Sequence, residues 1–189
     1  MSITLLSVVV FVVFLYLYGL YISLIKTKNR LKEASSGIDV QLKKRYDLLP
    51  NILNMAAKFM EHEKTLLSEI VNLRNSAIKQ DFTTHPKERM QIESALNDKL
   101  RTLWINVENY PDLKSNQTMV QAMQTFEETE ENIAAARRFY NSALTELKNA
   151  VEIFPSSLVA RLLNIKADQP FFEAGENEKS RIDVKDYFK

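Results

Sequence analysis

Residues 116–154 read NQTMVQAMQTFEETEENIAAARRFYNSALTELKNAVEIF, and they predict one long amphipathic helix. The stretch contains neither glycine nor proline, and it is rich in Ala, Leu, Glu and Gln, which favour helix. Alternating steps of three and four residues connect ten positions along it, as in the buried stripe of a helix. These positions are Met123, Phe126, Glu130, Ile133, Arg137, Tyr140, Leu144, Leu147, Val151 and Phe154. Such a stripe needs other helices to cover it.

Three earlier segments have the same periodicity, and we expect helices over about 27–49, 51–79 and 86–110. Their stripes are Leu31, Ala34, Ile38, Gln41, Arg45 and Leu48; Ile52, Ala56, Phe59, Glu63, Leu66, Ile70, Leu73 and Ala77; and Leu96, Leu100, Leu103, Val107 and Tyr110. Pro50 either separates the first two helices or kinks one long helix. Because the connections are short, neighbouring helices should be antiparallel. The sequence therefore predicts an all-α fold, with an antiparallel up-and-down four-helix bundle over residues 26–155.

Two helix starts in this bundle have local signals. Pro86 suits the first turn of the third helix, where its missing N–H costs nothing. Ser115 or Asn116 can cap the fourth helix through a side-chain oxygen.

Residues 3–25, ITLLSVVVFVVFLYLYGLYISLI, carry no charge and predict a single transmembrane helix. At about 1.5 Å per residue the run measures roughly 35 Å, enough for a hydrocarbon core of about 30 Å. A cleaved signal peptide is the alternative, but no basic residue precedes the run and no small-x-small site closes it. Lys26, Lys28, Arg30 and Lys32 follow the run, and such flanks stay on the cytoplasmic side. We therefore expect residues 1–25 to form a short outer N-terminus and an anchor in the lipid of the cell membrane, with a cytoplasmic body.

The composition argues against several functional classes. The 25 basic and 24 acidic residues give a net charge of +1, so nucleic acid is not an expected partner. The chain has no cysteine and 2 histidines, and Phe59 and Phe82 stand three positions before His62 and His85. A bundle di-metal site would need glutamates at those positions. We therefore expect no metal, no cofactor and no catalytic site.

Five charged residues lie in or beside the apolar stripes of the predicted helices. They are Arg45, Glu63, Arg74, Glu130 and Arg137. A buried charge must be paired and hydrogen-bonded, so we expect a network across the helices that fixes their register. The alternative is a loose bundle in which these long side chains extend to water.

An apolar segment follows the bundle at residues 156–174. It contains Leu158, Arg161, Leu162, Phe171 and Phe172. Four antiparallel helices return the chain to the membrane side, so this segment could lie in the headgroup layer. Alternatively, its Leu and Phe residues cap the open end of the bundle.

The last part of the chain, residues 175–189, is polar. We expect it to be a poorly ordered tail. Val184, Tyr187 and Phe188 are the residues that could hold it to the body.

Several strings in the chain resemble the LemA family. They are IDVQLKKRYDLLPNIL at 38–53, EHEK at 61–64, LRNSA at 73–77, ENYPDLKSNQ at 108–117, EETEENIAAARRFYNSA at 127–143, FPSSLVA at 154–160 and PFFEA at 170–174. The resemblance covers about residues 27–174 and the anchor. Ser35 and Ser36 depart from the family pattern, and the last fifteen residues match nothing firm.

The resemblance implies a bacterial single-pass membrane protein with a cytoplasmic antiparallel helical bundle, and it supplies no catalytic residues. The polar positions that match the family are Asp39, Arg45, Asp47, Asn51, Glu63, Arg74, Asn75, Asp112, Glu130, Arg137 and Asn141. We interpret them as structural or as contacts to a partner.

Two functional hypotheses remain. The first is an interaction or scaffold protein at the inner face of the membrane, which binds another protein or itself. The alternative is a membrane-remodelling or lipid-contacting element that uses the anchor and residues 156–172.

Overall fold

The structure, a computed structural model, describes residues 2–82 and 84–173, and this part of the chain is helical without strands. Its elements are α1 (Ser2–Phe59), the 3-10 turn η1 (Glu61–Glu63), α2 (Lys64–Lys79), α3 (Pro86–Val107), α4 (Pro111–Lys114), α5 (Gln117–Glu152) and α6 (Ser156–Leu162). The all-α prediction is confirmed. The polar tail, with Val184, Tyr187 and Phe188, lies outside the described residues.

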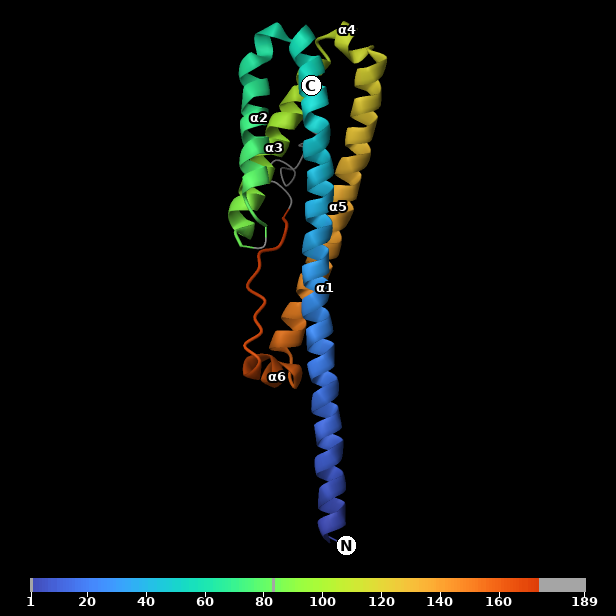
Figure 1. The fold of residues 1–189 in the computed structure, drawn as a ribbon, viewed down its shortest axis with the longest axis vertical. Coiled ribbons are helices and arrows are strands. Elements are labelled where there is room, and N and C mark those ends of the chain that lie inside the picture. The colour runs from blue at the N-terminus through green and yellow to red at the C-terminus, as the bar shows by residue number, and fades with distance from the viewer. Residues whose placement is uncertain (1, 83, 174–189) are drawn as a thin grey trace, which may run out of the picture.

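The body consists of two antiparallel helix pairs (Figure 1). α1 and α5 share the most extensive interface, and α2 and α3 form a second pair. The α2–α3 pair is short and lies beside the end of α1 that is farthest from the N-terminus (Figure 1). All four helices therefore overlap only in this distal half of the body. The proximal half contains α1, α5, α6 and the chain that follows α6.

α1 continues through Pro50, so of the two alternatives at this proline the structure has one long helix. Residues 51–59 belong to α1, and the chain turns at η1. A proline inside a helix leaves the carbonyl four residues earlier without its helical donor. Here that carbonyl belongs to Tyr46, and it accepts a hydrogen bond of 2.7 Å from Arg74 Nε on α2. Arg74 thus replaces the donor that Pro50 lacks.

The helix starts agree with their local signals. Pro86 lies in the first turn of α3. The Asn116 side chain caps α5 by accepting from the amides of Thr118, at 3.0 Å, and Met119, at 3.2 Å. With 36 residues, α5 is the longest helix of the body outside α1.

The predicted stripes are mostly buried, with shifts at the ends of the segments. In α1 the buried apolar side chains between Ile38 and Ile52 are Leu42, Tyr46 and Leu49, whereas Gln41 and Leu48 are half-buried. Phe59 and Phe154 are exposed. Phe59 is the last residue of α1, and Phe154 lies in the connection between α5 and α6.

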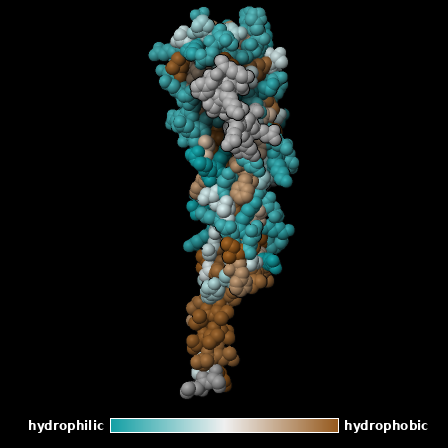
Figure 2. Space-filling model, turned by 180° about the vertical axis from the view of Figure 1, so that it is seen from behind, coloured by the Kyte–Doolittle hydropathy of each residue, from teal (hydrophilic) through white to brown (hydrophobic). Residues whose placement is uncertain are grey.

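The N-terminal part of α1 extends away from the body (Figure 1), and Figure 2 shows an apolar surface along the face of it that is in view. Its large hydrophobic side chains from Ile3 to Tyr21 are mostly exposed. In length and composition α1 can cross a membrane, a property that signal sequences share. Leu24 is the first described residue of α1 that the body buries.

Candidate functional site

A fully buried arginine, Arg45, joins three helices in the distal half of the body. Its exposed fraction is 0%. Nη2 forms an ion pair with Glu93 on α3, which is also buried. Nη1 donates to Asn97 Oδ1 at 2.6 Å and to Glu130 Oε1 on α5 at 3.0 Å. One side chain from α1 therefore fixes the positions of α3 and α5.

A second arginine, Arg89, extends this cluster to α2. Its Nε lies 3.1 Å from Glu93 Oε1, and its Nη1 donates to the carbonyls of Ala77 and Gln80 at the end of α2. The Tyr46 hydroxyl accepts from Arg89 Nη2 at 2.9 Å and donates to Glu93. Two arginines and two carboxylates balance in charge, which satisfies the requirement that buried charges be paired.

Burial shifts the pKa of several groups in and near this cluster. It would lower the pKa of Arg45, but Glu93 and Glu130 raise it by more, so Arg45 stays charged. Burial, and then Glu93, raise the pKa of the Tyr46 hydroxyl. Burial also raises the pKa of Asp39, which precedes Arg45 on α1, whereas the charge of Arg89 opposes this shift. Desolvation disfavours each ionised carboxyl or phenol in the same way.

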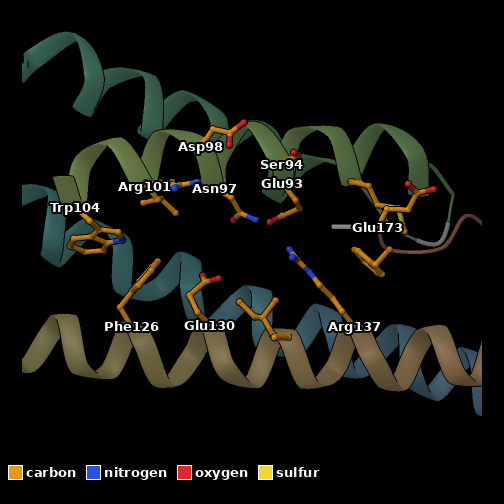
Figure 3. A pocket seen from close by; sticks show the side chains of 15 residues that line it. Glu93, Ser94, Asn97, Asp98, Arg101, Trp104, Phe126, Glu130, Arg137 and Glu173 are labelled. Carbon is orange, nitrogen blue, oxygen red and sulfur yellow. The ribbon is translucent and has the colours of Figure 1, made fainter. Parts of the chain in front are cut away.

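A groove of about 700 Å³ lies between α3 and α5, directly over the cluster. Figure 3 shows side chains from both helices directed into it. Its lining combines charges of both signs with aromatic rings. The lining residues are Met90, Glu93, Ser94, Asn97, Asp98, Leu100, Arg101, Trp104, Phe126, Glu130, Ile133, Ala134, Arg137, Phe172 and Glu173.

Aromatic side chains mark both ends of the groove. At the distal end the ring centroids of Trp104 and Phe126 are 5.1 Å apart. At the proximal end Phe172 stacks on Phe82 at 5.4 Å, and the Arg137 guanidinium lies 5.3 Å from the Phe172 ring centroid. The groove therefore has aromatic residues at its two ends and polar residues at its centre.

The chain after α6 is fastened to α5 and forms the proximal wall of the groove. Asn141 Nδ2 donates to the Phe172 carbonyl at 2.8 Å, and the Phe172 amide donates back to Asn141 Oδ1 at 2.9 Å. The Tyr140 hydroxyl donates to the Pro170 carbonyl at 3.2 Å. Lys148 Nζ lies 4.2 Å from the Phe171 ring. These contacts hold an extended segment without a strand partner.

The five charges predicted as one network do not all meet. The structure brings Arg45 and Glu130 together, whereas Arg137 lines the groove against Phe172. Arg74 bonds the α1 backbone because Pro50 leaves a carbonyl open there. Glu63 lies in η1, where the chain turns, and not on a helix stripe.

Sequence reasoning missed two central residues of the cluster, Arg89 and Glu93. A signal for them exists in the α3 stripe. Steps of three and then four residues back from Leu96 reach Glu93 and Arg89. Because this part of the stripe is charged, it does not look like a buried helix face, although both residues are buried.

The residues of the predicted membrane-surface segment are separated in the structure. Leu158, Arg161 and Leu162 are exposed at the proximal end of the body. Phe171 and Phe172 are half-buried and contact Lys148 and Asn141 of α5. The chain after α6 runs from that helix toward the α2–α3 pair (Figure 1). The segment therefore neither forms one surface nor caps the bundle with its two leucines.

The chemistry of the groove suits binding. Among residues 2–82 and 84–173, no group of three or more His, Asp or Glu side chains could hold a metal ion. The groove instead offers carboxylates, guanidinium groups and an indole at intervals along two helices. Such a lining can bind an extended polypeptide through ion pairs and ring contacts.

Known proteins share sequence similarity with most of this chain. The model of the family described as "LemA family" matches residues 34–186. The match extends into the last fifteen residues, where sequence inspection alone found no resemblance. Protein LemA of Metamycoplasma hominis is 28% identical over 178 residues, which cover 91% of this chain and 78% of the relative. The chain therefore belongs to the LemA family.

Proposed function

We propose that this chain is a membrane-anchored interaction protein without catalytic activity. In this proposal the N-terminal part of α1 is a retained anchor, and the body lies at the inner face of the cytoplasmic membrane. The groove between α3 and α5 binds a segment of a partner protein.

The proposal of an anchor rests on the bare apolar end of α1 and on the charges that follow it. Side chains from Ile3 to Tyr21 have no protein to cover them, so water would expose a long apolar rod. A bilayer covers such a rod at no cost in backbone hydrogen bonds. Lys26, Lys28 and Lys32 then favour a cytoplasmic body.

The observation that carries the binding role is the construction of the groove. The Arg45 cluster holds α3 and α5 with bonds of 2.6 and 3.0 Å, so the two walls are positioned before a partner arrives. Preorganised walls reduce the entropy cost of binding. Trp104 at one end is a residue type that often dominates binding energies.

The charges of the groove indicate the chemistry of the partner. Asp98 and Arg101 lie on α3, and Arg137 lies on α5. A polypeptide that complements them carries both basic and acidic residues, together with an apolar side chain for the Trp104 end. Complementary charges would set its direction in the groove.

Site-specific photocrosslinking in intact membranes tests this role. A photoreactive phenylalanine replaces Ser94, which lines the groove, or Ser68, which is exposed on α2 outside it. We expect a crosslinked protein from position 94 and none from position 68. The charge-reversing variant Arg101→Glu should remove the crosslink while the melting temperature of the body stays unchanged.

The same experiment can contradict the proposal. Isolated monomers from position 94 at native abundance would refute a partner in the groove. Equal crosslinking from positions 94 and 68 would show contact without a specific site. A crosslink to a second copy of this chain would make the groove a self-association site and replace the proposed partner.

A further inference from the structure

The proximal end of the body carries an exposed apolar patch. It consists of Ile153, Phe154, Leu158, Leu162 and Leu163, from the end of α5 through α6. Leu162 is 86% exposed and Phe154 is 74% exposed. Single exposed apolar residues are common, but five within eleven consecutive positions form a surface that normally contacts something.

The outward face of α6 is apolar, and its inward face packs on the body. Ala160 is buried, whereas Leu158 and Leu162 point away from the body. α6 contacts both α1 and α5. The helix is therefore fixed in place with its apolar side uncovered, and it does not need to unfold or rotate to expose that side.

The length of the bare part of α1 sets the height of this patch above the membrane. From Ile3 to Tyr21 the helix measures roughly 29 Å at about 1.5 Å per residue, close to the hydrocarbon thickness of about 30 Å. Leu24, one turn further, is already 1% exposed within the body. Since no spacer remains between this apolar stretch and the body, an anchored chain would hold the end of the body at the headgroup layer.

Figure 1 places α6 at the level where the bare part of α1 begins, and Figure 2 shows apolar surface at this end of the body. Basic side chains lie at the same end. Lys26 and Lys28 follow the anchor on α1, and Arg161 and Lys166 belong to α6 and the chain after it. An apolar face flanked by cations is the pattern of helices that lie in a bilayer interface.

We propose that α6 is a second membrane contact, which inserts Leu158 and Leu162 among the acyl chains near the headgroups of anionic phospholipids. This inference rests on the anchor of the proposed function and goes beyond it. A single helix would let the body rotate and tilt, whereas two contacts fix its orientation. The α3–α5 groove would then keep a constant direction relative to the membrane.

Tryptophan quenching in proteoliposomes tests this contact on the full chain. The chain has 1 tryptophan, so W104F with L162W moves the only indole to α6. The vesicles contain phosphatidylglycerol and phosphatidylcholine brominated near the headgroup end of the acyl chain. We expect the introduced tryptophan to emit at blue-shifted wavelengths and to lose more than half of its intensity to the brominated lipid.

Two controls fix the interpretation. Ile105, at the distal end of α3, is apolar and 60% exposed, so W104F with I105W places an indole in a similar setting far from the membrane. This control should emit as in water and stay unquenched. Equal far-UV circular dichroism melting of both variants shows that each body is folded.

The outcomes separate the inference from the proposal on which it depends. If alkaline carbonate extracts the chain from the vesicles, the anchor is absent and both ideas fall. If the chain resists extraction but the tryptophan on α6 emits as in water, the anchor stands and the α6 contact is refuted. Blue-shifted emission without quenching would mean that protein, such as a second copy, covers the patch, and this also refutes the contact.

Discussion

Replacing Arg45 by methionine should destabilise the body more than any other single charge removal at its surface or in its core. Arg45 is 0% exposed and is held by Glu93, Asn97 and Glu130. Methionine keeps most of the side-chain volume but removes every donor. The substitution therefore leaves the Glu93 carboxylate, 2% exposed, without its main cation.

The expected loss in the free energy of unfolding depends on the partners that Glu93 keeps after the substitution. Removing one partner of a buried ion pair costs about 3–5 kcal/mol. Glu93 keeps Arg89 at 3.1 Å and the Tyr46 hydroxyl, which places the cost near the lower value, at about 3 kcal/mol. For a chain of this size, this loss corresponds to a decrease in melting temperature of roughly 6–12 °C.

The assay is thermal unfolding of the full-length protein in mild detergent, followed by far-UV circular dichroism. Lys44→Met is the matched control, because Lys44 is an exposed cation adjacent to Arg45 on α1. It should change the stability by less than about 0.5 kcal/mol. Adding Glu93→Gln to Arg45→Met should recover little of the loss, because it takes the ion-pair partner from the buried Arg89.

Two results would refute this reasoning. If Arg45→Met lowers the melting temperature no more than Lys44→Met, the cluster is solvated and fixes nothing. If Glu130→Gln, at a side chain that is 34% exposed, costs as much as Arg45→Met, burial does not determine which charges matter.

Three further predictions address single groups. Arg74→Met should cost about 1–3 kcal/mol because it leaves the Tyr46 carbonyl without a donor, and less when Pro50→Ala restores the helical amide; an equal cost in both backgrounds would contradict this role, as measured by urea unfolding. Burial raises the pKa of Asp39 above 3.8, so ionised Asp39 weakens the fold at neutral pH. Asp39→Asn should therefore raise the melting temperature at pH 7, and the gain should vanish as the pH falls through the raised pKa; a gain independent of pH would refute it. Tyr140→Phe should cost about 1 kcal/mol at pH 7 by losing one hydrogen bond, and because burial raises the pKa of Tyr140 to about 12, this deficit should shrink as the pH rises from about 10 toward that value.

The helix content and the buried faces could be read from the sequence because they depend on local spacing. The stripe from Phe126 to Leu147 on α5 is buried or half-buried at each predicted step. The cap at Asn116 and the start at Pro86 also depend on neighbouring residues alone. The apolar run of α1 depends only on length and lack of charge.

The features that the sequence did not reveal depend on residues far apart in the chain. A proline ends or kinks most helices. α1 continues through Pro50 because Arg74, 24 positions later, supplies the donor that the proline lacks. Glu93 looked like a surface residue because its partner Arg45 lies on another helix. The groove lies between α3 and α5, which the Arg45 cluster connects. The periodicity of either helix alone does not encode the distance between the two helices.

The central claim is that the apolar end of α1 remains as an anchor with the body inside the cell. The chain has no cysteine, so Ser68→Cys introduces a single thiol on the exposed face of α2. Spheroplasts that express this variant are treated with a membrane-impermeant maleimide before and after lysis, and the mass of the membrane-bound protein is measured. The account predicts labelling only after lysis, on a chain that still contains residues 1–25. Labelling of intact spheroplasts, or a product that begins after residue 25, would contradict it.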